Sequence, residues 1–123
     1  MRRLLFLTLA AAAAIATTVQ AAPVACPASQ HGKRLTAASL FDGPPEDGAD
    51  LRPEDSARPI NGQMTTWWSL AELHKQGRQP HLVCEYVSGG KLILKLSKAV
   101  RDCARILELG PDKAYHVRSV RCR

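Results

Sequence analysis

The sequence lacks the short motifs that mark most enzymes and metal sites. It contains no G-x-S-x-G nucleophile elbow, no HExxH or CxxC pair, and no glycine-rich phosphate loop before a helix. Aromatic residues are also scarce, with two each of Trp, Tyr and Phe among 123 residues. We therefore expect no catalysis, no metal and no cofactor, and nucleic acid is a disfavoured partner because few rings are present for base stacking.

Long apolar runs are also missing after residue 21, so the mature chain is expected to have no transmembrane segment. Residues 1–21 themselves resemble a cleavable export signal. Two arginines precede an apolar run over residues 4–16, and small residues flank the expected cleavage site after Ala21. Removal of 21 residues from 123 leaves 102, which is enough for only one domain, residues 22–123. We expect this domain to be a periplasmic monomer.

The four cysteines, Cys26, Cys84, Cys103 and Cys122, are an even number in a small exported chain, which predicts two disulfides. A lipid anchor on Cys26 is the competing interpretation, but Pro23 stands where a lipidated cysteine usually has an aliphatic residue. Four cysteines allow three connectivities. We favour Cys26 with Cys122 and Cys84 with Cys103, because the first pair would tie down both ends of the mature chain. No free thiol would then remain.

Most of the mature chain is typical of β-strands. Alternating β-forming residues around a glycine pair predict a hairpin over residues 81–97, and residues 34–41, 65–68, 104–109 and 115–122 are further strand candidates. Ser69 and Glu72 have the spacing of a capping box, which predicts a short helix ending near Gly77. The expected fold is mainly β, a small antiparallel sheet curled into a barrel or sandwich, with one short helix and two disulfides.

Strand alternation also predicts which side chains are buried. Trp67 and Trp68 should point to opposite faces, with one in the core. Val117 and Val120 do not share a face in a regular strand, so the facing of that strand stays ambiguous. The expected core residues come from the hairpin and are Leu82, Cys84, Tyr86, Leu92, Leu94 and Leu96.

Residues 42–62 contain four prolines and three glycines, which predicts a long loop. Its first part is acidic: residues 42–55 carry six acidic groups and only one basic group. We expect the carboxylates to dock a basic protein partner, by analogy with periplasmic lysozyme inhibitors, or merely to keep the loop in water. Their order does not fit a calcium-binding EF-hand. The candidate docking residues are Asp42, Glu46, Asp47 and Asp50.

Residues 56–123 have the opposite charge, with 12 basic and five acidic groups. A basic β surface could bind a polyanion of the cell envelope, which is the alternative to protein docking. The candidate residues for this alternative are Lys91, Lys95, Lys98, Arg101 and Arg105.

Three sequence features also suggest a family. The chain has FDGPP at residues 41–45, LVC-x-Y at residues 82–86 and a C-terminal Cys-Arg pair. With these features it resembles an uncharacterised family of small exported Gram-negative proteins, first named from a Salmonella locus tag. The resemblance implies export to the periplasm and supplies no catalytic residue.

Overall fold

The computed structural model describes residues 23–54 and 59–123, so the expected export signal lies outside the described residues. No helix within these two ranges is long and apolar enough to cross a membrane. The elements in chain order are β1 (Val24–Ala25), β2 (Ser29–Gln30), β3 (Lys33–Asp42), the 3-10 turn η1 (Pro45–Asp47), β4 (Asp50–Leu51), β5 (Gln63–Ser69), α1 (Ala71–Lys75), β6 (Pro80–Tyr86), the 3-10 turn η2 (Val87–Gly89), β7 (Lys91–Lys95), β8 (Asp102–Leu109) and β9 (Tyr115–Cys122).

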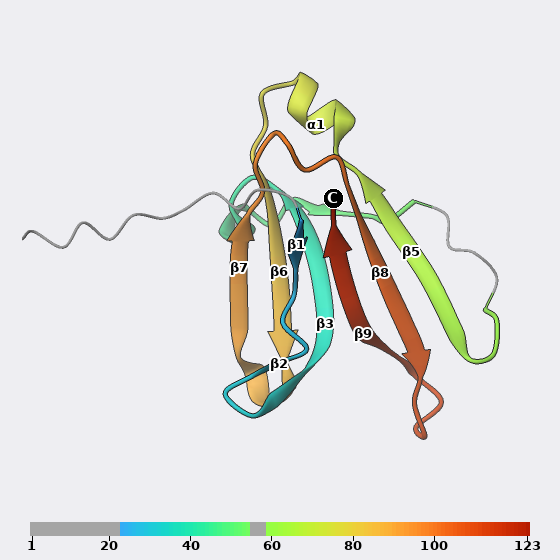
Figure 1. The fold of residues 1–123 in the computed structure, drawn as a ribbon. Helices are drawn as coiled ribbons and strands as arrows, with labels where there is room; N and C mark the ends of the chain where they lie inside the picture. The colour runs from blue at the N-terminus through green and yellow to red at the C-terminus, as the bar shows by residue number, and fades with distance from the viewer. Residues whose placement is uncertain (1–22, 55–58) are drawn as a thin grey trace, which may run out of the picture.

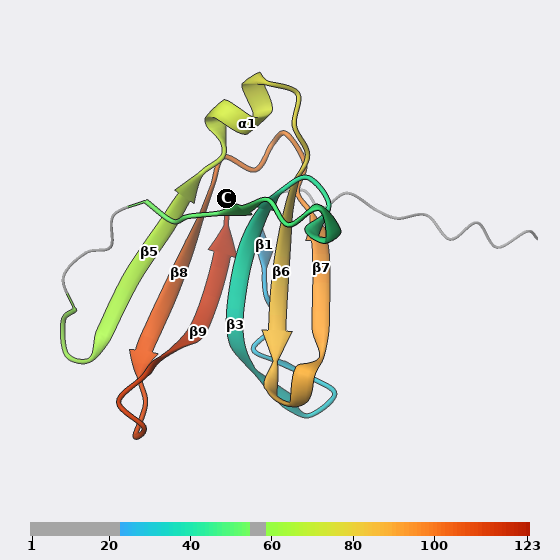
Figure 2. The same ribbon diagram turned by 180° about the vertical axis from the view of Figure 1, so that it is seen from behind.

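The strands form two antiparallel sheets. The first, which we call the β8 sheet, has the order β1-β9-β8-β5. The second, the β6 sheet, has the order β2-β3-β6-β7, with β4 also paired to β3. Both views in Figures 1 and 2 show β3 of one sheet beside β9 of the other, while β5 and β7 lie at opposite margins. The expected mainly β fold is therefore confirmed, and the sheets form an open sandwich rather than a closed barrel.

The hairpin over residues 81–97 is present as β6 and β7, with register pairs such as Leu82 with Leu94. Its inward residues on β6, together with Leu96, are buried as predicted, whereas Leu92 and Leu94 are only partly buried against the core. Because β7 is the last strand of its sheet, it has a neighbouring strand on one side only, and its side chains are less covered than those of β6. Trp68 is buried and Trp67 is exposed, which confirms that the two tryptophans point to opposite faces.

A β-bulge explains which way the side chains of the C-terminal strand β9 face. Ile106 pairs with Ser119 and Leu107 pairs with Val117, so Arg118 is an extra residue in β9. The extra residue reverses the alternation after Val117. As a result Val117 and Val120 both point into the core and are both buried.

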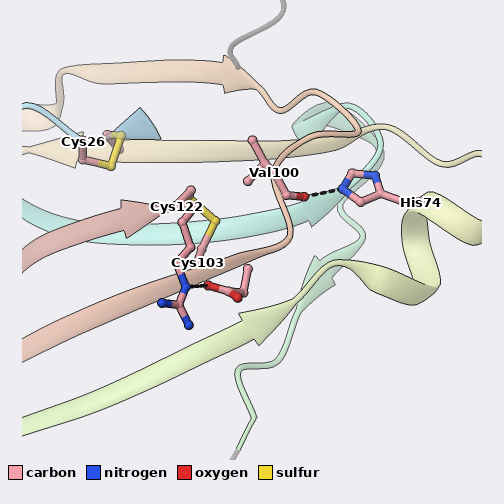
Figure 3. Close-up of a disulfide and its surroundings, with 8 residues drawn as sticks. Cys26, His74, Val100, Cys103 and Cys122 are labelled. Carbon is pink, nitrogen blue, oxygen red and sulfur yellow. Dashed lines mark hydrogen bonds and ion pairs between the residues drawn. A yellow bond between two sulfur atoms is a disulfide. The ribbon is translucent and has the colours of Figure 1, made fainter. Parts of the chain in front are cut away.

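The short helix α1 depends on contacts with the rest of the chain, because five residues are too few to be stable alone. Leu73 packs into the core, and the His74 Nε2–H donates to the Val100 carbonyl (Figure 3). The predicted capping box is wrong. Leu70 occupies the N-cap position and its side chain makes no capping hydrogen bond, so the chain continues one residue beyond Ser69 before the helix begins.

Two disulfides are present, as expected, but the favoured pairing is wrong. The bonds are Cys26–Cys84 and Cys103–Cys122, and the described chain has no free cysteine (Figure 3). Cys103 and Cys122 are register partners on adjacent strands, with Cα atoms 4.0 Å apart. Because Cys103 lies directly opposite Cys122 and Cys84 lies next to Cys26, the predicted Cys84–Cys103 and Cys26–Cys122 pairs do not form. The Sγ of Cys26 is bonded to Cys84, which leaves no thiol there for a lipid.

The two disulfides close loops of different length, so their removal should have unequal effects. The sequence separations are 58 residues for Cys26–Cys84 and 19 for Cys103–Cys122. From loop-closure entropy we expect the double serine variant of the first pair to lose about 4 kcal/mol and that of the second about 3 kcal/mol. Urea unfolding followed by circular dichroism measures both. An equal or reversed order would contradict this prediction.

Candidate functional site

The acidic part of the predicted loop is a structured segment, which we call the acidic segment (residues 42–54). It contains η1 and β4, so the prediction of a continuous loop over 42–62 was wrong for this part. Figure 2 shows it leaving the end of β3 beside β6 and β7 and then crossing toward β5. Pro44 is the N-cap residue of η1, and Pro45 is the first residue of this turn. Gly48 then reverses the chain in a left-handed conformation.

The acidic segment is fastened to both sheets by main-chain hydrogen bonds. Asp42 N–H donates to the Ala49 carbonyl at 2.9 Å, and Glu54 N–H donates to the Trp67 carbonyl at 2.7 Å. Between them, the Trp68 indole N–H donates to the Leu51 carbonyl at 2.9 Å. Such anchoring reduces the conformational entropy that the segment would lose on binding a partner.

Three of the four predicted docking residues have unpaired carboxylates. Glu46, Asp47 and Asp50 are exposed, and none has an ion pair within 4.0 Å among the described residues. Asp42 differs, because its Oδ1 accepts a hydrogen bond from Arg78 Nε at 2.7 Å. The structure therefore leaves Glu46, Asp47 and Asp50 available to a partner, whereas Asp42 fastens the end of β3 to the residues before β6.

A groove of about 380 Å³ lies beside η1 on the outer face of the β6 sheet. Its floor includes the register row Ser39, Val83 and Ile93, and Ile93 is 51% exposed. Val83 is buried, whereas Ile93 on the marginal strand β7 is exposed and so available for contact. The groove is lined by Ser39, Phe41, Pro45, Glu46, Val83, Glu85, Lys91 and Ile93.

Arg105 is a partly buried cation on the inner face of the β8 sheet. Its guanidinium carbon lies 5.0 Å from the centre of the Trp68 ring. Nε donates to Thr66 Oγ1 at 3.0 Å, and Nη1 donates to the Ala38 carbonyl on β3 at 2.9 Å. Burial lowers the pKa of Arg105, and the nearby charge of Asp50 opposes that shift. This side chain is thus a polar link between the two sheets.

A second hollow, of about 340 Å³, opens beside Arg105, and we call it the arginine pocket. The acidic segment forms much of its wall, so the pocket exists only because that segment crosses the β8 sheet. Its lining residues are Ser39, Asp50, Leu51, Arg52, Pro53, Trp68 and Arg105.

The basic residues predicted to bind a polyanion are not gathered on one surface. Lys91 and Lys95 lie on β7, and Lys91 Nζ is 3.5 Å from the Glu85 carboxylate. Lys98 and Arg101 belong to the connection between β7 and β8. Arg105 shares the inward face of β8 with Cys103 and Leu107 and is partly buried.

Local sequence patterns could have indicated the role of Arg105 but not its partners. Period two along β8 places it between two apolar inward positions, which marks it as an unusual buried charge. Its stacking on Trp68 depends on the pairing of β5 with β8, and its bond to Ala38 depends on how the sheets pack. Neither relation is local in sequence. Among the described residues no group of three or more potential metal ligands occurs.

Residues 28–123 match the family model described as Type VI secretion system Tli immunity protein. The chain belongs to this family. Membership in an immunity-protein family implies a binding role toward a partner effector, which agrees with the expected binding role. The match does not test the FDGPP and LVC-x-Y motifs or the link to a Salmonella locus. No curated protein and no solved structure matches the chain significantly.

Replacement of Arg105 by Lys should destabilise this immunity protein. A lysine keeps the charge but lacks the planar fork, so it cannot bond Thr66 and Ala38 together while stacking on Trp68. We expect a loss of about 1 to 3 kcal/mol in the free energy of unfolding. Urea unfolding checks this, with Arg121→Lys as the control because Arg121 is exposed on β9. Equal stability of the two variants would contradict the role assigned to Arg105.

Proposed function

We propose that this chain protects its cell by binding a type VI secretion effector in the periplasm and blocking its toxic activity. The observation that carries the proposal is the family match over residues 28–123. The two disulfides support it, because such bonds persist in oxidising compartments. The export signal predicted at residues 1–21 would deliver the chain to that compartment.

The docking surface that we propose consists of Glu46, Asp47, Asp50 and the neighbouring groove with Ile93. The carboxylates have no described ion-pair partner, and they stand on a segment whose backbone is already ordered. A basic patch on the effector would complement them and speed encounter, while an apolar side chain in the groove would add buried area. A lysozyme partner rested on analogy alone, and the family match favours an effector in its place.

The polyanion alternative has weaker support. Its five residues are divided between β7, the following connection and the inner face of β8. Binding of a polyanion depends on several cations facing the same phosphates, whereas Arg105 points between the sheets toward Ala38 on β3. We therefore retain effector binding as the proposed function.

Killing between sister strains tests the proposal directly. A sister strain deleted for this gene should be killed by a parent with an active type VI secretion system, and the full chain should restore its survival. A chain without residues 2–21 should not restore survival, because the protein would remain in the cytoplasm. Colony counts of the recipient after contact give the result. The effector is the secreted protein whose deletion from the attacker abolishes the killing.

Equal killing with and without this gene would refute the proposal. Equal protection by the chain without residues 2–21 would place the protective encounter in the cytoplasm, which contradicts the periplasmic part of the proposal.

Charge reversal at Asp47 should weaken effector binding. Asp47→Lys removes a carboxylate of the docking surface and adds repulsion toward a basic patch, so we expect about a tenfold rise in the Kd. Isothermal titration calorimetry with the purified effector measures the change. Glu72→Lys is the matched control, because Glu72 is an exposed acid on α1. Equal effects of the two reversals would exclude the acidic segment as the contact.

A further inference from the structure

Arg105 is a partly buried charge with no direct ion pair among the described residues. Its partners at contact distance are a hydroxyl, a main-chain carbonyl and the face of an indole ring. No described carboxylate lies within 4.0 Å of its guanidinium, although charges withdrawn from water are normally paired. Within residues 23–54 and 59–123, its Nη2 group has no hydrogen-bond partner.

The arginine pocket brings a second guanidinium to the same place. Arg52 lines it from the acidic segment, and no ion pair within the described chain neutralises Arg52. Asp50 also lines the pocket, but its carboxylate lies beyond 4.0 Å from both arginines. Two cations and one anion leave the pocket with a net positive charge and N–H donors, and an oxyanion satisfies both.

We propose that the arginine pocket receives a carboxylate side chain, an aspartate or a glutamate, from the effector. Arg105 is held rigidly by Thr66 and Ala38, so its remaining donors are oriented in advance. Arg52 stands on the exposed wall and pairs with the same carboxylate. The volume of about 340 Å³ accommodates a side chain rather than only a small ion. This inference rests on the proposed function for the identity of the partner.

A carboxylate fits better than a phosphate because of Asp50. Its negative charge lies on the same pocket wall, where it repels a doubly charged group more than a singly charged one. The positively charged pocket and the unpaired carboxylates then form one surface along the acidic segment that carries charges of both signs. Glu46 and Asp47 attract basic residues of the effector, while the pocket accepts an acidic one. An effector with both signs can dock in only one orientation, which supplies specificity.

The first experiment uses the mature chain alone, with acetate as the probe. In ¹⁵N nuclear magnetic resonance spectra, the Arg105 Nε–H signal should shift and saturate as sodium acetate is added at constant ionic strength maintained with chloride. Arg52→Gln should raise the half-saturating concentration roughly threefold or more, because a charged donor is lost. Arg121→Gln, which removes an exposed charge from the same sheet, should leave it unchanged. An Arg105 signal that acetate does not move, or that only inorganic phosphate moves, overturns the inference.

The second experiment uses the effector found by the competition assay. Arg52→Gln should raise its Kd by about tenfold, whereas Arg121→Gln should have no effect. If the wild-type chain protects its cell but Arg52→Gln binds the effector with unchanged Kd, the pocket inference is wrong and the proposed function stands. If the wild-type chain gives no protection, the proposed function fails, and the acetate titration still decides whether the pocket binds a carboxylate. As a control, the urea unfolding curve of Arg52→Gln should match that of the wild-type chain, which shows that the variant is folded.

Discussion

The two sheets share no hydrogen-bonded strand pair within the described chain, so their association depends on links between them. One link is covalent: Cys26 follows β1 of the β8 sheet and is bonded to Cys84 of the β6 sheet. Polar links include the bonds from Arg105 to the Ala38 carbonyl, from the Trp68 indole to the Leu51 carbonyl, and from the Tyr86 hydroxyl to the Pro27 carbonyl at 2.8 Å. Small cores are marginally stable, and these links hold the packed faces in register. The candidate site lies where these faces meet the acidic segment.

The acidic segment has a structural role and a proposed binding role at once. Leu51 covers Trp68 and accepts its indole hydrogen bond, so the segment completes the core at the margin of the β8 sheet. The same backbone holds Glu46, Asp47 and Arg52 outward. A binding surface whose backbone is already ordered loses little conformational entropy on association. The ordered backbone of this proline-rich segment therefore favours binding through the carboxylates that it carries.

Sequence patterns predicted the local features of this fold and missed the nonlocal ones. Period two correctly identified the hairpin at residues 81–97 and the opposite facing of Trp67 and Trp68. It could not predict the bulge at Arg118, because a bulge is defined by the partner strand. The disulfide pairing was missed for the same reason: it follows from β9 lying beside β8, which no single segment encodes. In the site, the acidic residues were visible as a charge run, but the contacts of Arg105 with Trp68 and Ala38 depend on strand pairing and sheet packing and could not be predicted.

The observed connectivity joins the first cysteine of the chain to the second and the third to the fourth. A polypeptide that enters an oxidising compartment N-terminus first presents its thiols in this same order. Oxidation that keeps pace with this order joins each sulfur to its native partner, so consecutive pairing reaches the observed bonds without later disulfide exchange.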